Sequence, residues 1–268
     1  MFPQRTGPGL GVSSPPRQHD VMRWFVLLAA ALLGLAGGSP AAAETPCPAI
    51  QAQPLALPAT RAALREGRPL VILAFGSSST EGAGASTPDR TYPARLEARL
   101  HAAMPGVPLT VLNRGRSGED VTEMLARLDR EVIASSPTLV IWQAGANAVL
   151  KGMPPETFHA LMAEGLARLR ATGTDVVLMD SQRAPRILAS PNHPVFDALM
   201  IGLAAERQVP LFSRAALMRR WEAVGAPASA FLSEDGLHHN DRGYECLAHA
   251  LAESVVASLH LSARMARR

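Results

Sequence analysis

A serine-rich turn and a carboxylate–imidazole pair are the parts of this sequence best suited to chemistry. The turn, residues 75–82 (Phe-Gly-Ser-Ser-Ser-Thr-Glu-Gly), directly follows the apolar run at residues 70–74. A buried strand that ends in small residues presents a serine hydroxyl at its carboxyl end, where ligands bind in open α/β sheets. Near the other end of the chain, Asp235 and His238 are three residues apart and can share one face of a turn. Serine, histidine and aspartate are the components of an acyl-transfer triad, which is recognised by the role of each residue and not by chain order.

Two further loops between these ends contain candidate hydrogen-bond donors. Residues 113–118 (Asn-Arg-Gly-Arg-Ser-Gly) follow the strand-like residues 109–112, and residues 145–147 (Gly-Ala-Asn) follow residues 139–142. Each loop contains glycine and comes after an apolar run, so each is expected to direct a backbone N–H group or an amide side chain to the same sheet edge. The oxyanion intermediate of acyl transfer needs preorganised donors of this kind.

With these four blocks in this order, the chain resembles the SGNH/GDSL hydrolase family. That family has its serine in a Gly-Asp-Ser-like first block, a glycine in the second, Gly-x-Asn in the third and Asp-x-x-His near the C-terminus, and the resemblance covers roughly residues 70–245. It implies that Ser78 is the nucleophile, that His238 is the general base and that Asp235 orients the imidazole. His239 is interpreted as a flanking residue, because only His238 has the three-residue spacing from the aspartate.

The resemblance also implies an oxyanion hole formed by the N–H groups of Ser78 and Gly118 and by the side chain of Asn147. The sequence departs from the family's common pattern at two positions. Ser77 stands where many members have aspartate, and Ala148 follows Asn147 where many members also have aspartate. Neither position belongs to the triad or to the oxyanion hole, so these departures bear on the subfamily and not on the chemistry.

The N-terminal 43 residues have the features of a cleavable secretory signal. Residues 24–36 are an uninterrupted apolar run of 13 residues, which follows Arg23 and precedes Ser-Pro-Ala-Ala-Ala at residues 39–43. A basic flank, an apolar run too short to span a bilayer, and small residues at its end are typical of such signals. We expect cleavage after Ala43, where the small-x-small rule is satisfied.

We expect the mature protein to be exported, either periplasmic or secreted, and not anchored to the membrane. Cys47 follows Glu-Thr-Pro, which lacks the small apolar triplet that precedes a lipid-modified cysteine. The start of translation stays open between Met1 and Met22, because residues 1–21 are rich in proline and glycine.

Removal of residues 1–43 leaves 225 residues, enough for one α/β domain with a substantial core. The same removal takes away three arginines and one aspartate, so the formal net charge falls from +3 to +1. This balance, without a basic run interleaved with aromatic residues, gives no reason to expect a nucleic-acid partner. Neither a phosphate loop nor metal-ligand spacing is found, so the sequence implies no metal and no organic cofactor.

Short apolar runs alternate with helical patterns along the mature chain. The runs predict strands at residues 70–75, 109–113, 138–143, 175–180 and 209–212, each short and apolar as in a sheet covered on both faces. Apolar residues at helical spacing predict buried stripes from Val121 to Val132 and from Phe158 to Leu169. The alternation predicts right-handed βαβ units and a parallel sheet.

Together with the resemblance, this pattern predicts an α/β fold, a three-layer α/β/α sandwich around a five-stranded parallel sheet of the flavodoxin-like SGNH hydrolase type. Residues 44–66 are interpreted as a proline-rich arm, extended over residues 44–60, and residues 67–268 as the hydrolase domain.

The segment after the fourth strand, residues 181–194, is too long and too rich in proline for a tight turn. Loops at this sheet edge hold substrate-selecting groups. Arg183 and Arg186 are therefore candidates to contact a polar or anionic acceptor, and the alternative is that both are surface arginines on a loop.

The only two cysteines, Cys47 and Cys246, are expected to form a disulfide. Export would place them in an oxidising compartment, where an even number of cysteines favours pairing. The last helix should pack beside the first strand, so the arm could pass close to Cys246. The alternative is a buried free Cys246 and an exposed Cys47.

The main functional hypothesis is a secreted or periplasmic serine esterase that hydrolyses short-acyl carboxylic esters, including O-acetyl esters, through an acyl-enzyme on Ser78. The alternatives are an SGNH-type O-acyltransferase on envelope polysaccharide and a lipase or thioesterase-like enzyme for longer acyl chains. A non-catalytic carbohydrate-binding module is disfavoured by the intact serine, histidine and aspartate set. The expected partner is a small-molecule or polysaccharide ester, with no nucleic acid and no stable membrane anchor after signal cleavage.

Overall fold

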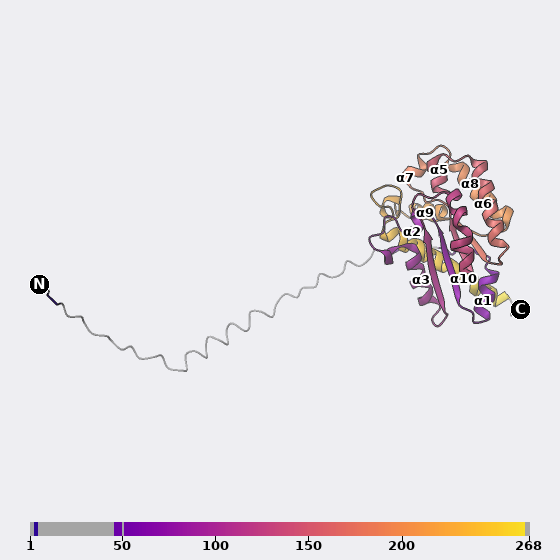
Figure 1. Cartoon of the computed structure of the whole chain (residues 1–268), viewed down its shortest axis with the longest axis horizontal. Coiled ribbons are helices and arrows are strands. Elements are labelled where there is room, and N and C mark those ends of the chain that lie inside the picture. Colours follow the sequence, from indigo (N-terminus) through magenta and orange to yellow (C-terminus); the bar gives the residue numbers. More distant parts are fainter. Residues whose placement is uncertain (1–2, 5–45, 50, 266–268) are drawn as a thin grey trace. The chain divides into compact units, whose positions relative to one another are not determined.

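The computed structural model describes residues 3–4, 46–49 and 51–265, with side chains up to residue 259. The predicted signal segment, residues 1–43, lies outside the described residues except for residues 3–4. From Pro46 onward the chain forms one compact unit, shown in Figure 1. Within the described part, none of the helices has the length and apolarity that crossing a membrane requires.

A five-stranded sheet with the order β2-β1-β3-β4-β5 lies in the middle of this unit (Figure 1). The four strand pairs are all parallel. The predicted α/β fold with a five-stranded parallel sheet is therefore confirmed, and each strand end lies within two residues of its predicted position. The strands are β1 (Leu70–Gly76), β2 (Leu109–Gly115), β3 (Leu139–Gln143), β4 (Asp175–Met179) and β5 (Leu211–Phe212).

The strands differ in burial according to their place in the sheet. Residues of β3 and β4 are buried throughout and those of β1 nearly so, whereas β2 is mostly half-buried. β2 is less buried than the central strands because it forms an edge of the sheet. The exposed edge is partly capped, since the Val111 N–H donates to Glu97 Oε1 (2.9 Å).

Helices cover both faces of the sheet, as the predicted three-layer sandwich requires. The chain passes from β1 to β2 in one direction and from β2 through β3 and β4 to β5 in the other. Right-handed crossovers therefore place α3 on one face and α4, α6 and α8 on the opposite face. On the first face α3 (Tyr92–Ala103) packs along α10 (Asp241–Met265), and on the second face α6 (Pro155–Arg170) packs against both α4 (Val121–Arg127) and α8 (His193–Arg207).

The remaining elements are short, and two of them differ from the sequence-based expectation. The buried stripe from Val121 to Val132 does not belong to one regular helix, because α4 ends at Arg127 and a π-helical turn follows. The proline-rich segment 181–194 contains a helical turn, α7, where a loop was expected. These shorter elements are α1 (Pro58–Arg65), α2 (Ser78–Glu81), η1 (Pro88–Arg90), η2 (Leu128–Val132), η3 (Ile133–Ser135), α5 (Ala146–Lys151), α7 (Pro185–Leu188), α9 (Arg214–Ala223) and η4 (Ala228–Ala230).

The proline-rich arm packs on the domain. The N–H of Gln53 donates to Ser254 Oγ (2.9 Å), and the Leu55 and Leu57 side chains are buried. The prediction of extended backbone up to residue 60 is wrong from Pro58, where α1 begins. Proline suits the first turn of a helix because its fixed φ is helical and its missing N–H would have no partner there.

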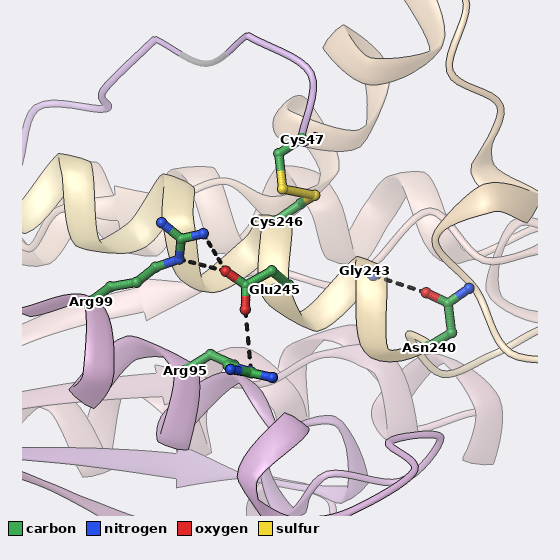
Figure 2. Close-up of a disulfide and its surroundings, with 7 residues drawn as sticks. All are labelled: Cys47, Arg95, Arg99, Asn240, Gly243, Glu245 and Cys246. Carbon is green, nitrogen blue, oxygen red and sulfur yellow. Dashed lines mark hydrogen bonds and ion pairs between the residues drawn. A yellow bond between two sulfur atoms is a disulfide. The ribbon is translucent and has the colours of Figure 1, made fainter. Parts of the chain in front are cut away.

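A disulfide joins Cys47 in the arm to the buried Cys246 in α10 (Figure 2). The neighbouring Glu245 forms ion pairs with Arg95 (3.2 Å) and Arg99 of α3. The same turn of α10 is therefore linked covalently to the arm and by ion pairs to α3. Because the sequence separation of the two cysteines is 199 residues, the bridge closes nearly the whole domain into a loop.

We predict that the bridge contributes substantially to stability, because closing a long loop restricts the unfolded chain. Replacing both cysteines by alanine should lower the free energy of unfolding by about 2–5 kcal/mol, measured by urea unfolding of the mature protein. Mass spectrometry of the non-reduced protein should find no free thiol, and two free thiols per chain would contradict the prediction. Arg99→Met, which removes a neighbouring ion pair only, is the control and should have a smaller effect.

Candidate active site

The turn after β1 is held in place by Gln143, the last residue of β3. The N–H and hydroxyl of Ser77 and the hydroxyl of Thr80 all donate to Gln143 Oε1, at 3.0, 3.2 and 3.2 Å. Ser78 follows as the first residue of α2, so its N–H has no partner within the helix. Gln143 was not among the residues predicted from the sequence. A buried polar residue at the end of an apolar strand is the signal that could have identified it.

Ser78, His238 and Asp235 form a continuous chain of hydrogen bonds. Ser78 Oγ lies 2.7 Å from His238 Nε2, and His238 Nδ1 lies 2.5 Å from Asp235 Oδ2. The two ring nitrogens thus face the serine and the carboxylate, respectively. The structure brings together three residues that come from opposite ends of the domain, with the imidazole in the middle.

The carboxylate of Asp235 is fixed by hydrogen bonds from its own loop. Its Oδ1 atom accepts from Ser233 Oγ (2.7 Å), Leu237 N (2.8 Å) and His238 N (2.9 Å). Partial burial acts to raise the pKa of Asp235, but these hydrogen bonds, with that from the His238 ring, outweigh burial and hold the pKa well below its usual range. The carboxylate therefore stays ionised beside the imidazole. Ser233 was not among the residues predicted from the sequence.

His239 occupies a different environment from His238. Its side chain is fully buried, its Nδ1 donates to the carbonyl of Phe231 (2.9 Å), and its ring meets Tyr244 edge-on at 5.5 Å between centroids. Burial, together with the charge of Arg214, lowers the pKa of His239 to about 3, so the ring is neutral. These contacts agree with its interpretation as a flanking residue.

The loops that carry Gly118 and Asn147 follow the two strands on either side of β1. Gly118 has φ of +79°, which glycine adopts readily, in the loop between β2 and α4. Asn147 is in the first turn of α5, and its Nδ2 donates to the carbonyl of Glu119 at 2.7 Å. This hydrogen bond joins the second-block loop (the segment between β2 and α4, with Gly118) to the third-block loop (the segment from the end of β3 into α5, with Asn147). Asn147 Nδ2 has a second hydrogen that can be donated to another acceptor.

The two arginines of the segment 181–194 lie in different surroundings. Arg183 is half-buried and its Nε lies 3.8 Å from Glu222 Oε2 of α9. Arg186 is exposed in α7, and its backbone N–H lies 3.5 Å from the carbonyl of Gly236. Helix α7 therefore lies beside the loop that carries Asp235. The expected substrate contact stays a prediction for both, and Arg186 is the better placed of the two.

Within the described residues, no cluster of three or more histidine, cysteine, aspartate or glutamate side chains could hold a metal ion.

Residues 42–261 match the Non-GDSL lipase-like family. The chain belongs to this family. The resemblance to SGNH/GDSL hydrolases is thereby confirmed. The expectation that the protein is an enzyme that hydrolyses ester bonds is also confirmed.

Two curated relatives and many solved structures are similar to this chain. An arylesterase from Vibrio mimicus is 26% identical over 157 residues, covering 58% of this chain and 74% of the relative. Esterase TesA from Pseudomonas aeruginosa is 29% identical over 171 residues, covering 62% and 78%, respectively. A lipase/acylhydrolase from Enterococcus faecalis matches with a TM-score of 0.61 at 22% identity, over 70% of this chain and 96% of its own. An acetylxylan esterase from Geobacillus stearothermophilus matches with a TM-score of 0.60 at 20% identity, over 69% and 94%. These structural matches support the fold.

We predict that His239 affects stability and its pH dependence. Its pKa of about 3 in the folded chain lies below the ordinary value of 6.5, so between these pH values the unfolded chain binds a proton that the folded chain does not. The free energy of unfolding should therefore fall as the pH drops from about 6.5 toward 3, by at most ~1.4 kcal/mol per pH unit from this group. His239→Gln should flatten this part of the profile in urea unfolding while kcat/KM stays within a few-fold of wild type.

His238→Ala is the variant to compare with His239→Gln, because it removes the neighbouring histidine. It should lower kcat/KM by about 10³-fold or more, because it removes the imidazole that lies 2.7 Å from Ser78 Oγ and is the candidate base. A variant pair in which His239→Gln is inactive and His238→Ala is active would contradict both assignments.

Proposed function

We propose that this protein is a serine esterase that hydrolyses short-acyl carboxylic esters, including O-acetyl esters, through an acyl-enzyme on Ser78. The observation that carries the proposal is the unbroken chain of hydrogen bonds from Ser78 Oγ through the His238 ring to Asp235 (2.7 and 2.5 Å). A serine hydroxyl is activated when a base lies within hydrogen-bond distance and a third group orients that base.

In the acylation step, Ser78 Oγ attacks the carbonyl carbon of the ester while His238 Nε2 takes the hydroxyl proton. Negative charge develops on the carbonyl oxygen, where the N–H groups of Ser78 and Gly118 and the amide of Asn147 are the proposed donors. The C–O bond to the alcohol then breaks, and His238 returns its proton to the leaving oxygen. Asp235 keeps its charge throughout and stabilises the imidazolium that forms.

In the deacylation step, water replaces the alcohol. His238 removes a proton from the water as its oxygen attacks the acyl carbon, and a second oxyanion forms at the same donors. Collapse of this intermediate releases the carboxylic acid and returns the proton to Ser78 Oγ. An O-acyltransferase would follow the same steps with a sugar hydroxyl in place of water.

The proposed hydrolysis of esters is supported by the curated relatives. One is named an arylesterase and the other an esterase, and both names describe the hydrolysis of esters. This supports hydrolysis over transfer to a sugar. A lipase or thioesterase-like role differs in the length of the acyl chain, which a substrate series distinguishes.

We also propose that the enzyme acts outside the cytoplasm, in the periplasm or after secretion. The disulfide between Cys47 and Cys246 supports this location, because disulfides persist in oxidising compartments. The predicted signal at residues 1–43 supports it independently. Ester groups on envelope or extracellular polysaccharides are substrates that an enzyme in this location meets.

We predict that Ser78→Ala abolishes turnover and leaves the fold intact. Loss of the nucleophile should reduce kcat by about 10³-fold or more, measured with p-nitrophenyl acetate. A fluorophosphonate probe should label the wild type at Ser78 and should not label the variant.

The neighbouring serines are the matched controls for this prediction. Ser77→Ala and Ser79→Ala should stay active, because His238 Nε2 faces Ser78 Oγ and because Gln143 Oε1 still accepts from the backbone N–H of residue 77 and from Thr80 in Ser77→Ala. An active Ser78→Ala variant would exclude the proposed acyl-enzyme.

We predict that p-nitrophenyl esters from C2 to C12 are hydrolysed with the highest kcat/KM at C2–C4. An optimum at C8–C12 would instead support the lipase or thioesterase-like role. A sugar acceptor added to the same assay should leave most of the acyl group with water, and predominant acyl transfer would support the acyltransferase role.

A further inference from the structure

One buried arginine connects the ends of the two strands that lead to the proposed active site. Arg127, the last residue of α4, has a side chain only 3% exposed. Its Nη2 donates to the carbonyl of Gly76 (3.2 Å), the last residue of β1, and to that of Arg114 (3.0 Å), the last but one of β2. The guanidinium also stacks over the ring of Phe75, 4.6 Å from its centroid. The Arg127 side chain thus fixes the spacing between the ends of β1 and β2, which lead to the first-block loop with Ser78 and to the second-block loop with Gly118.

The other side of the same guanidinium holds the second-block loop itself. Arg127 Nε forms an ion pair with Glu119 Oε2 (2.7 Å), and Nη1 forms a second ion pair with Glu131 Oε2 (3.1 Å). Glu119 directly follows Gly118 in the chain. Its carbonyl accepts the hydrogen bond from Asn147 Nδ2 at 2.7 Å. Glu119 therefore connects Arg127 to both loops that carry expected oxyanion donors.

Each of the three proposed oxyanion donors lies two or three links from Arg127. Ser78 is two residues after Gly76, Gly118 is the residue before Glu119, and Asn147 is hydrogen-bonded to the Glu119 carbonyl. An oxyanion hole acts through the fixed geometry of its donors, and small displacements weaken it.

We propose that Arg127 is the positioning residue of the oxyanion hole. Through its contacts with Gly76 and Glu119, it holds the donors of Ser78, Gly118 and Asn147 at fixed positions relative to one another. The inference rests on the proposed function of Ser78 as nucleophile. Arg127 itself does not touch the reacting atoms in this assignment and acts only through the backbone and Glu119.

The choice of arginine supports this role over simple filling of the core. A buried ion pair is costly to desolvate, and well-packed apolar residues often stabilise a protein as well or better. The planar guanidinium presents five N–H donors in a fixed fork, which lets Arg127 contact four acceptors on separate segments, whereas the ammonium of lysine offers no such fork. The helix also departs from α geometry immediately after Arg127, at the π-helical turn that carries Glu131, and such turns are frequent at functional sites.

The test compares Arg127→Lys and Glu119→Gln with wild type, with active sites counted by fluorophosphonate titration. Arg127→Lys keeps a buried positive charge and removes the fork. Glu119→Gln keeps the carbonyl that binds Asn147 and removes the negative charge. We expect kcat for p-nitrophenyl acetate per titrated site to fall at least 10-fold in Arg127→Lys and several-fold in Glu119→Gln, with KM within two-fold of wild type.

A double-mutant cycle separates positioning from a general structural effect. If Arg127 acts through the oxyanion donors, Arg127→Lys should cost much less in the Asn147→Ala background than in wild type. Independent effects, in which the two losses multiply, would overturn the proposal. If Arg127→Lys does not fold, the same cycle between Glu119→Gln and Asn147→Ala decides the question.

Arg168→Met is the matched control for loss of a partly buried arginine. Arg168 pairs with Asp129 (2.8 Å) and Glu164 (3.3 Å) and makes none of the contacts of Arg127, so this variant should keep kcat within two-fold. Wild-type kcat per titrated site in both Arg127→Lys and Glu119→Gln, with Ser78→Ala inactive, would overturn the inference and leave the proposed function standing. Activity in Ser78→Ala would instead remove the proposed function itself.

Discussion

The parallel placement of β1 between β2 and β3 is the constraint on which the rest of the site depends. Parallel strands end at the same edge of the sheet, so the loops after Gly76, Gly115 and Gln143 emerge side by side. The chain leaves β1 for β2 on one face and returns past β1 to β3 on the other. The nucleophile candidate therefore stands where the direction of winding reverses, and loops with backbone and amide donors lie on both sides of it.

His238, the candidate base, reaches this edge through long-range contacts of the C-terminal segment. The first turns of α10 are tied to the loop after α2, since Tyr244 donates to the carbonyl of Ala83 (2.6 Å) and Asp241 accepts from the backbone and hydroxyl of Ser86 (2.8 and 2.5 Å). Further along α10, Glu245 pairs with α3 and Cys246 is bridged to the arm (Figure 2). The loop that carries His238 precedes α10 directly, so these contacts fix its distance from the serine.

Residues of the same type have different surroundings in this structure, as the adjacent His238 and His239 and the two arginines Arg127 and Arg183 show. His238 has a serine on one ring nitrogen and a carboxylate on the other, whereas His239 is enclosed and kept neutral by burial. Arg127 satisfies its donors with carboxylates and carbonyls next to the site, and Arg183 is drawn toward Glu222 on α9. In each case the hydrogen-bond or ion-pair partners indicate the role of the side chain better than the residue type does. A polar group that is removed from water is costly unless the protein supplies a donor or acceptor for it.

The sequence by itself determined the strands, the order of the motifs and the candidate triad, because apolar periodicity and residue spacing are local properties. The strand that begins at Leu70 and the three-residue spacing of Asp235 and His238 are examples. Only the tertiary structure decided that β2 is a half-exposed edge, that Leu55 and Leu57 of the arm are buried, and that α1 begins at Pro58. It also revealed the hydrogen bond between Ser77 and Gln143 and that between Gly76 and Arg127, whose partners are 66 and 51 residues apart in the sequence. The energy of a buried hydrogen bond or ion pair depends on the relative position of its two partners. That position is set only when folding has brought the strands and loops together.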